Sequence, residues 1–418
     1  MDKFIINGPS TLNGSVNING AKNAVLPIMA ATLITPGEFS LQNVPDLRDT
    51  RTMIKLLETI GAAVEFNDHH LRINTDACDS PIAPYDQVKT MRASFDVLGP
   101  LLSRFGWAKV SLPGGCAWGP RPVDLHLKAL EALGVSVTLD GGYIIAEGEV
   151  KGGEFRFPIS SVGATKNAIM AAVGGTGTTV LHNAACEPEV VETARFLNEL
   201  GARISELGGT TLTIEGNRDH LATSLEFEVI PDRIEAGTFL IAAALTGGSV
   251  ELANVKPDHL QIVIKKLQQA GQDVSVYQNS LRVSGQHPIE PVDIETAPYP
   301  GFPTDLQAQW MALMICSSGQ SIIKEGIYSD RFNHVPELIR LGGKVSMNNN
   351  IAHIKGIDHL TGAPVMSTDI RASASLVLAG LAAEGETEIS RVYHIDRGYQ
   401  LIEERFQKLG ANIKRVSD

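Results

Sequence analysis

The sequence predicts an α/β protein assembled from six copies of one repeat, with apolar helices inside and strands outside. Two observations carry this prediction. An amphipathic helix that ends at a glycine and runs into a short strand recurs along the whole chain of 418 residues. Each copy is preceded by a second, more apolar helix, and the intervening segments alternate in polarity with the period of a strand. Each repeat therefore has the approximate order βαβαββ.

The recurring segment of helix, glycine and strand is spaced about 70 residues apart, so six copies account for the chain. Glycine is expected just past a helix end, because it alone takes the left-handed conformation at little cost. The copies are Leu56–Phe66, Leu127–Leu139, Phe196–Leu207, Leu267–Val276, Leu338–Met347 and Phe406–Val416. Their closing glycines are Gly61, Gly134, Gly201, Gly271, Gly342 and Gly410.

The earlier helix of each repeat is apolar nearly all round in several copies, which indicates burial on every side. This arrangement inverts the common plan in which helices cover a central sheet. The expected helices are Ala21–Leu33, Met91–Leu102, Ala164–Val173, Ile234–Leu245, Asp305–Ile315 and Arg371–Ala383.

The sixth repeat ends without the partner strand that follows the others, and the N-terminal segment Phe4–Gly8 matches the missing piece. We therefore expect the N-terminal strand to pair with the C-terminal end. Two domains of three repeats each follow, residues 22–229 and residues 1–21 with 230–418. An open repeat array is the alternative, but it does not explain a strand supplied by the N-terminus.

Composition narrows the class of protein. The formal charge is −12, whereas nucleic-acid binders usually have a basic balance, so no nucleic-acid partner is expected. No apolar stretch reaches membrane-spanning length, and Met1–Asn7 does not resemble a signal peptide. The four cysteines form no CxxC pair and no metal-like spacing, so we expect reduced thiols, no metal and a cytoplasmic location.

Cations stand at the starts of several inner helices, where the helix dipole disfavours them by up to about 1 kcal/mol. They are Lys22, Arg92, Lys166, Arg233 and Arg371. One such residue is usually a solvated side chain. Recurrence at equivalent positions favours an anion site built from cations and free N–H groups, in a cleft between the domains. A phosphorylated small molecule fits this pattern.

The segment 113–122 is a loop rich in glycine and proline, and it carries Cys116. Free cysteines are usually buried small hydrophobes, but a loop exposes this one, and Arg121 would lower its thiol pKa. Asp305 is a carboxylate where other repeats have a cation, so it is either a favourable helix-start residue or a general base. Arg331 and Arg397 lie on loops, where each alone suits a surface charge.

Six motifs in order along the chain resemble the enolpyruvyl transferase family, and within it the UDP-N-acetylglucosamine 1-carboxyvinyltransferases. The resemblance covers Met1 to about Val416. The motifs are Asn19–Asn23, Lys89–Ser94, Leu112–Cys116, Arg121–His126, Phe302–Asp305 and Tyr393–Tyr399. The chain departs from the usual family pattern at Trp118, Pro120 and Lys166.

The resemblance implies an inside-out α/β barrel fold and transfer of the enolpyruvyl group of phosphoenolpyruvate to the 3′-hydroxyl of UDP-N-acetylglucosamine, with release of phosphate. This reaction is the first committed step of peptidoglycan synthesis, and so serves cell-wall growth and division. No cofactor is implied. We expect a monomer.

The resemblance also implies the roles of individual residues. Cys116 would protonate C3 of phosphoenolpyruvate, could carry a covalent adduct of it, and would be the target of the inhibitor fosfomycin. Asp305 would be the base for the sugar hydroxyl. Phosphoenolpyruvate would be held by Lys22, Asn23, Arg121 and Arg397, and Lys22 and Arg397 would also be catalytic. The nucleotide sugar would be bound by Arg92, Arg121, Pro122, Val123, Asp124, Leu125, Ile159, Ser160, Ser161, Val162, Asp305 and Ile327. Arg331 and Arg371 would form a surrounding cationic shell.

Three other functions remain open. An enzyme of the shikimate type shares the fold but lacks the cysteine loop, so Cys116 argues against it. A different nucleotide acceptor is a second alternative. A non-catalytic repeat protein is the third, and the joint presence of Lys22, Cys116, Asp305 and Arg397 argues against it.

Overall fold

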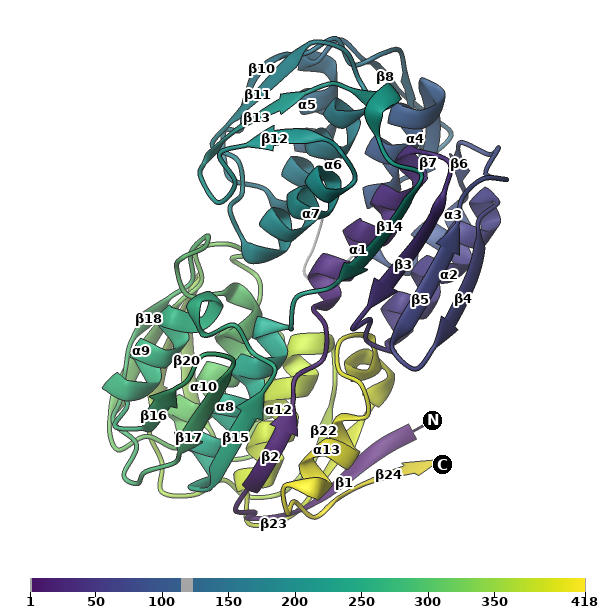
Figure 1. The fold of residues 1–418 in the computed structure, drawn as a ribbon. Coiled ribbons are helices and arrows are strands. Elements are labelled where there is room, and N and C mark those ends of the chain that lie inside the picture. Colours follow the sequence, from purple (N-terminus) through teal and green to yellow (C-terminus); the bar gives the residue numbers. More distant parts are fainter. Residues whose placement is uncertain (1, 114–122, 418) are drawn as a thin grey trace. The chain divides into compact units, whose positions relative to one another are not determined.

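The computed structural model describes residues 2–113 and 123–417, and these residues divide into two compact domains (Figure 1). The first domain comprises Gly20–Ile230, and the second comprises Met1–Asn19 with Pro231–Asp418. The sequence placed the borders at 22–229 and at 1–21 with 230–418. Each domain has its own hydrophobic core.

The first domain contains three four-stranded sheets, with strand orders β14-β3-β5-β4, β6-β7-β9-β8 and β10-β11-β13-β12. Its strands are β3 (Glu38–Gln42), β4 (Ala63–Asn67), β5 (His70–Asn74), β6 (Ile82–Ala83), β7 (Trp107–Ser111), β8 (Ser136–Asp140), β9 (Tyr143–Glu147), β10 (Gly153–Arg156), β11 (Thr178–His182), β12 (Arg203–Ser205), β13 (Thr211–Glu215) and β14 (Ser224–Glu228). Its helices are α1 (Lys22–Ala31), α2 (Arg48–Ile60), α3 (Tyr85–Val88), α4 (Leu98–Phe105), α5 (Asp124–Ala132), α6 (Val162–Val173) and α7 (Pro188–Glu199), with the 3-10 helices η1 (Thr32–Ile34), η2 (Arg92–Val97) and η3 (Arg218–His220).

The second domain repeats this plan with the orders β16-β17-β15-β2, β18-β19-β21-β20 and β22-β23-β1-β24. Its strands are β1 (Asp2–Gly8), β2 (Asn13–Asn17), β15 (Ser249–Ala253), β16 (Asp273–Val276), β17 (Ser280–Ser284), β18 (Ile294–Glu295), β19 (Gln320–Lys324), β20 (Lys344–Asn348), β21 (Ile351–Lys355), β22 (Pro364–Met366), β23 (Gly385–Ser390) and β24 (Ile413–Ser417). Its helices are α8 (Arg233–Thr246), α9 (Gln261–Gln269), α10 (Gln307–Ile315), α11 (Val335–Arg340), α12 (Ile370–Ala382) and α13 (Ile402–Lys408), with η4 (Pro257–Leu260), η5 (Thr304–Leu306) and η6 (Val392–Arg397).

The inner helices are apolar all round because they are enclosed on all sides, as the sequence predicts. In the second domain α8, α10 and α12 pack against one another, and every residue of α8 from Ile234 to Leu245 is buried. The outer helices keep one polar face, as α2 does. The six closing glycines all have positive φ angles, from 83° to 110°, which confirms their predicted role.

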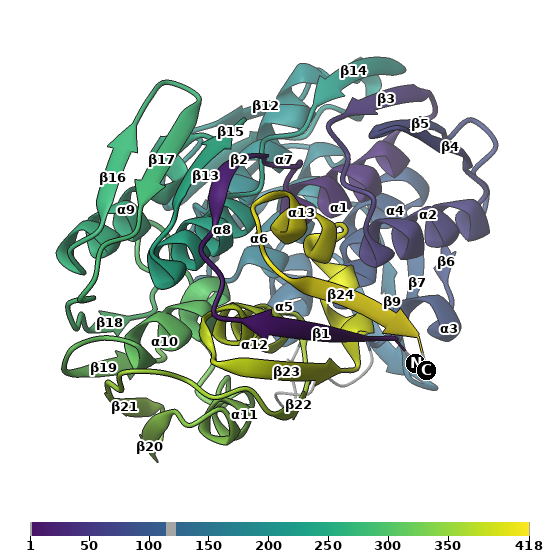
Figure 2. The same ribbon diagram turned by 90° about the horizontal axis from the view of Figure 1, so that it is seen from below.

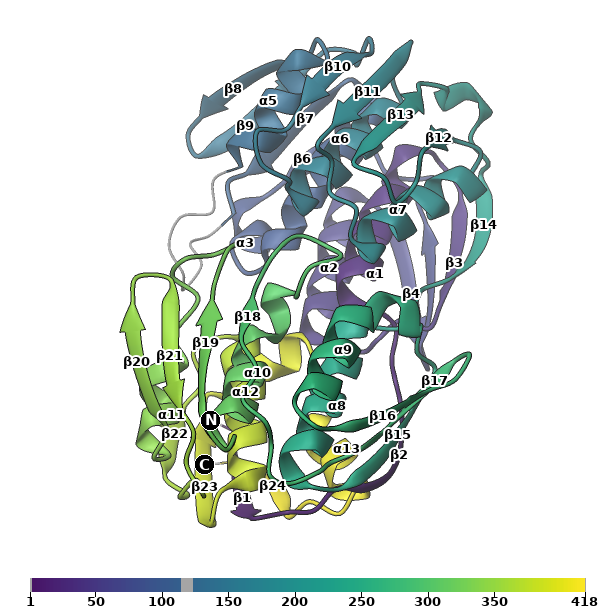
Figure 3. The same ribbon diagram turned by 90° about the vertical axis from the view of Figure 1, so that its left-hand side faces the viewer.

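The N-terminus closes the second domain. β1 pairs antiparallel with β24, with Phe4 opposite Arg415, and it also pairs with β23 on its other side (Figure 2). This confirms the prediction that Phe4–Gly8 completes the sixth repeat. A second exchange was not predicted: β2 joins the sheet of the fourth repeat, in parallel with β15 (Figure 3). In the same way, β14 joins the sheet of the first repeat beside β3.

The helix starts need correction in two repeats. The predicted helix Met91–Leu102 is a 3-10 helix, η2, followed by α4, and the predicted helix Asp305–Ile315 begins as η5 before α10. A 3-10 turn has three residues per turn instead of 3.6, and a six-residue pattern does not separate the two periods. Among the described residues, no helix combines the length and the apolar character needed to cross a membrane.

Candidate active site

Lys22 is the first residue of α1, and its charge is matched by a buried carboxylate. Its Nζ lies 3.4 Å from Oδ2 of Asp49, which belongs to the first turn of α2. Asn23 follows on the same turn and is partly buried. The helix dipole disfavours a cation at the start of α1, and the nearby negative charge of Asp49 offsets this cost for Lys22. The sequence did not single out Asp49.

Arg92, the first residue of η2, belongs to a buried charged cluster around Asp96. The ammonium group of Lys166, on α6, lies 3.3 Å from Oδ2 of Asp96, and both side chains are less than a tenth exposed. Nδ2 of Asn167 lies 3.5 Å from the other oxygen, Oδ1. Burial raises the pKa of the Asp96 carboxyl, and the positive charges of Lys166 and then Arg92 oppose that rise.

Asn167 extends this cluster to α5. Its Nδ2 also lies 3.1 Å from Nδ1 of His126, and its Oδ1 accepts a hydrogen bond from the backbone N–H of Gly99. Burial, together with the charges of Arg92 and Lys166, lowers the pKa of His126 to about 3, so the imidazole is neutral and accepts from Asn167. Three helical segments, η2, α5 and α6, are thus joined by one polar network.

The predicted nucleotide-sugar residues of the first domain lie at the starts of these segments. Val123 precedes α5, and Asp124 and Leu125 begin it. Ile159 is highly exposed, while the segment Ser160–Val162 is partly buried, and Oγ of Ser161 accepts a hydrogen bond from Ala164 N–H at the start of α6. The start of α6 lies close to α5. The structure therefore brings Arg92, 123–125 and 159–162 onto one connected framework.

Asp305 lies in the second domain between two arginines. Nη2 of Arg331 is 2.7 Å from Oδ1 of Asp305, and Nη2 of Arg371 is 2.7 Å from Oδ2. Burial acts to raise the pKa of the Asp305 carboxyl, but Arg371 and then Arg331 outweigh it and hold the pKa well below its usual value. Asp305 lies in the first turn of η5 and also bridges two arginines, and its role as a general base stays a prediction.

A buried hydrogen-bond network fixes Arg371 from behind. Nη1 of Arg371 donates to Oη of Tyr399 at 3.2 Å, and Oη also lies 2.8 Å from Oγ1 of Thr238. Nε2 of Gln309 donates to Oη of Tyr399, to Thr238 and to the backbone oxygen of Asp305. Residues of α8, α10 and α12 thus meet at one phenol group. Tyr399 ends the motif Tyr393–Tyr399, but the sequence predicts no role for it.

Glu325 organises the loop that carries Ile327 and Arg331. Its Oε1 accepts hydrogen bonds from the backbone N–H groups of Ile327 and Tyr328, and its Oε2 accepts one from Oγ1 of Thr304. Arg331 in turn donates from Nη1 to Thr304 Oγ1 at 2.9 Å. The loop is therefore connected to the residue that precedes Asp305. Sequence patterns did not reveal Glu325, because nothing local distinguishes it.

Arg397 is the last residue of η6, in the second domain with Asp305, Arg331 and Arg371. Lys22, Asn23, Arg92 and 159–162 belong to the first domain. The cleft between the domains stays a prediction. Cys116, Arg121 and Pro122 lie outside the described residues, as do Trp118 and Pro120.

Comparisons with known proteins agree on one family. The family model described as EPSP synthase (3-phosphoshikimate 1-carboxyvinyltransferase) matches residues 6–406. The UDP-N-acetylglucosamine 1-carboxyvinyltransferase of Chlorobaculum parvum is 54% identical over 99% of this chain and 98% of its own. Its counterpart from Geotalea daltonii is 51% identical over the full length of both chains.

Solved structures show the same fold. The enolpyruvyl transferase NikO from Streptomyces tendae superposes with a TM-score of 0.91 at 25% identity, covering 100% of this chain and 99% of that one. EPSP synthase from Acinetobacter baumannii superposes over the whole of both chains with a TM-score of 0.78 at 18% identity, a likeness of fold alone. The inside-out α/β barrel implied by the resemblance is thereby confirmed. The chain belongs to the enolpyruvyl transferase family, among the UDP-N-acetylglucosamine 1-carboxyvinyltransferases.

Proposed function

We propose that the protein transfers the enolpyruvyl group of phosphoenolpyruvate to the 3′-hydroxyl of UDP-N-acetylglucosamine and releases phosphate, the first committed step of peptidoglycan synthesis. The single observation that carries this proposal is the 54% identity over nearly the full length to a relative of that name. The paired cations and carboxylates of both domains support it, because both substrates are anions. A cytoplasmic monomer without a cofactor or metal belongs to the same proposal.

The reaction is an addition followed by an elimination. In the addition, Cys116 gives its thiol proton to C3 of phosphoenolpyruvate while the sugar hydroxyl oxygen bonds to C2. Asp305 takes the hydroxyl proton. In the elimination, the C2–O bond to phosphate breaks, the leaving phosphate takes the proton from Asp305, and a proton of C3 returns to the Cys116 thiolate, which restores the double bond. An acid and a base must therefore act on opposite partners.

The cations that the resemblance assigns to the site suit the charges of the substrates. Lys22 with Asn23, and Arg121 with Arg397, would hold the phosphate and carboxylate of phosphoenolpyruvate. Arg92, residues 121–125 and 159–162, Asp305 and Ile327 would hold the nucleotide sugar, inside a shell completed by Arg331 and Arg371. Charge-assisted hydrogen bonds to phosphate are among the strongest that side chains make.

Phosphate release tests the proposed reaction. Purified protein should release phosphate only when phosphoenolpyruvate and UDP-N-acetylglucosamine are both present. Equal release with shikimate 3-phosphate would favour the shikimate reaction, and equal release with another nucleotide sugar would favour a different acceptor. No release from any pair in a folded sample would favour a non-catalytic protein.

The acid role of Cys116 has its own test. Cys116→Ala should nearly abolish turnover, whereas Cys116→Asp should retain it because a carboxylic acid can also donate a proton. Cys78→Ala is a matched control, since Cys78 is a buried thiol of the same domain. Fosfomycin should add its mass to the Cys116 peptide and not to the Cys78 peptide. Full activity of Cys116→Ala would refute the acid role.

A further inference from the structure

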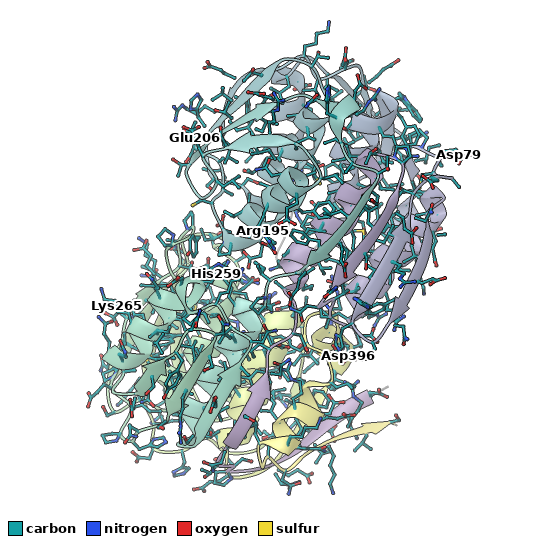
Figure 4. All side chains as sticks on the ribbon, in the orientation of Figure 1. Asp79, Arg195, Glu206, His259, Lys265 and Asp396 are labelled. Atoms are coloured by element: carbon teal, nitrogen blue, oxygen red, sulfur yellow. The ribbon has the colours of Figure 1, made fainter. Side chains whose placement is uncertain are left out.

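Arg415, on the last strand, is bound by carboxylates from three other elements of the second domain: Asp396 of η6, Glu403 of α13 and Asp2 of β1, whose Oδ2 lies 3.4 Å from Nη1. Its Nη2 and Nη1 lie 2.6 Å and 3.0 Å from Oδ1 and Oδ2 of Asp396, the paired geometry that an arginine forms with a carboxylate. Its Nε donates to Oε1 of Glu403 at 2.6 Å, and Glu403 belongs to the first turn of α13. Asp396 is labelled in Figure 4.

The position of Arg415 depends on the closure of the chain. It lies on β24 opposite Phe4 of β1, and its guanidinium is 5.0 Å from the centre of the Phe4 ring. The hydrogen bonds that Arg415 donates to Asp396 and Glu403, together with the negative charges of these carboxylates, raise the pKa of Arg415 despite its partial burial. The strand exchange at the N-terminus thus holds a permanent cation beside η6.

Asp396 directly precedes Arg397, and the backbone is also held on the other side of Arg397. The N–H groups of Gly398 and Tyr399 both donate to the backbone oxygen of Ile395 at 2.9 Å. A Cβ at Gly398 would lie 2.7 Å from Cγ2 of Ile370, so this turn packs directly against the start of α12. Arg397 therefore projects from a short turn whose preceding residue is fixed by Arg415.

We propose that Arg415 is a positioning residue, which acts through Asp396 to place Arg397 for the anionic groups of phosphoenolpyruvate. This rests on the proposed function, in which Arg397 holds that substrate. A displacement of about 1 Å in such a group can reduce a rate up to about 100-fold, so a turn that fixes the position of Arg397 would preserve the rate. A purely structural role, in which Arg415 only joins β24 to its neighbours, is the alternative.

Two of the three carboxylates on Arg415, Asp396 and Glu403, separate these roles. Asp396→Asn weakens the link to the turn of Arg397, whereas Glu403→Gln weakens the link to α13 and leaves Asp396 in place. Each change removes one negative charge beside the same guanidinium and keeps the side-chain shape. Both weaken the contacts that hold β24, but only Asp396→Asn acts on the residue next to Arg397.

The experiment measures Michaelis constants for both substrates in the wild type and the two variants, with melting temperatures alongside. Asp396→Asn should raise the constant for phosphoenolpyruvate by roughly 10- to 100-fold and leave that for UDP-N-acetylglucosamine unchanged. Glu403→Gln should leave both Michaelis constants near the wild-type values, even if it lowers the melting temperature as much as Asp396→Asn does.

Equal shifts for the two substrates, or equal shifts in the two variants, would overturn the proposal and favour the structural role. If Asp396→Asn does not fold, Arg415→Lys serves instead, because a lysine cannot make the paired contact with Asp396. It should give the same selective increase for phosphoenolpyruvate, and an unselective one would overturn the proposal. Wild-type protein that releases no phosphate would refute the proposed function itself, which is a different outcome.

Discussion

Replacing Lys166 with methionine should destabilise the first domain by about 3 kcal/mol. The methionine keeps most of the unbranched apolar chain, with a sulfur in place of Cδ, and removes the ammonium group that lies 3.3 Å from Asp96. Both side chains are less than a tenth exposed, so Asp96 would lose its nearest compensating charge without gaining water. Removing one partner of a buried pair costs about 3–5 kcal/mol, and Arg92, which also stabilises the Asp96 anion, favours the low end of that range.

The loss should appear in calorimetry and in hydrogen exchange. For a domain the size of Gly20–Ile230, each kcal/mol lowers the melting temperature by about 2–4 °C, so the expected decrease is roughly 6–12 °C. Peptides from 20–230 should exchange faster, while those from 231–418 should not. In the double variant Asp96→Asn with Lys166→Met, the buried carboxylate that lost Lys166 is also removed, so part of the stability should return.

The pH dependence of this loss has a defined sign. Burial raises the pKa of Asp96, and without Lys166 the pKa rises further, so the folded variant binds the proton more tightly than the unfolded chain does. The stability deficit relative to the wild type should therefore shrink as the pH falls from about 8 towards the unfolded value of about 4. A deficit below about 1 kcal/mol at neutral pH, or one that grows on acidification, would refute the buried pair as the cause.

Three further changes test other contacts. Tyr399→Phe removes the oxygen shared by Arg371 and Gln309, so it should cost about 1–3 kcal/mol in urea unfolding, while Tyr277→Phe at an exposed position should cost nothing measurable. Gly163→Ala should cost about 1–3 kcal/mol in the same assay, because the new Cβ would lie 3.0 Å from the His126 ring, and an unchanged midpoint would contradict that packing. Asp305→Asn should be less stable than the wild type above about pH 5, and the difference should shrink below about pH 4. The depressed pKa of Asp305 gives a stability that is complete above the unfolded pKa of about 4 and is lost as the pH falls towards the lower folded pKa.

The fold could be predicted because its signals are local and repeated. A glycine such as Gly61 or Gly410 ends a helix by its own backbone freedom, and its meaning does not depend on distant residues. The closure by β1 was also predictable, since one repeat lacked a strand and one segment matched it. The pairings of β2 with β15 and of β14 with β3 were missed because each strand crosses into a repeat that already looked complete.

Site residues could be predicted where an unusual residue type stands at a recognisable position, such as a cation at a helix start. They could not be predicted where the interacting partner is distant in the sequence. Cations at helix starts are recognisable because the helix dipole disfavours them, whereas the carboxylates that pair with them have no such local signal. Asp49 follows Lys22 by 27 residues, and Asp96 meets Lys166 from another repeat, so no spacing rule connects them. Glu325 and Tyr399 act through buried hydrogen bonds, which depend on the packing of several helices at once.

The arginine pair on Asp305 limits how this residue can serve as a base. A good general base has a pKa near the working pH, but Arg371 and Arg331 hold the pKa of Asp305 far lower. A proton from a sugar hydroxyl would therefore not transfer readily while both ion pairs persist.

A guanidinium group binds phosphate oxygens as strongly as it binds a carboxylate, so an anionic substrate can compete with Asp305 for these arginines. An anionic substrate that draws one arginine away raises the basicity of Asp305 at the moment the hydroxyl arrives. Arg371, on α12, donates to Tyr399, and Arg331 donates to Thr304 beside Asp305 itself. A base role for Asp305 thus requires that substrate binding precede proton transfer.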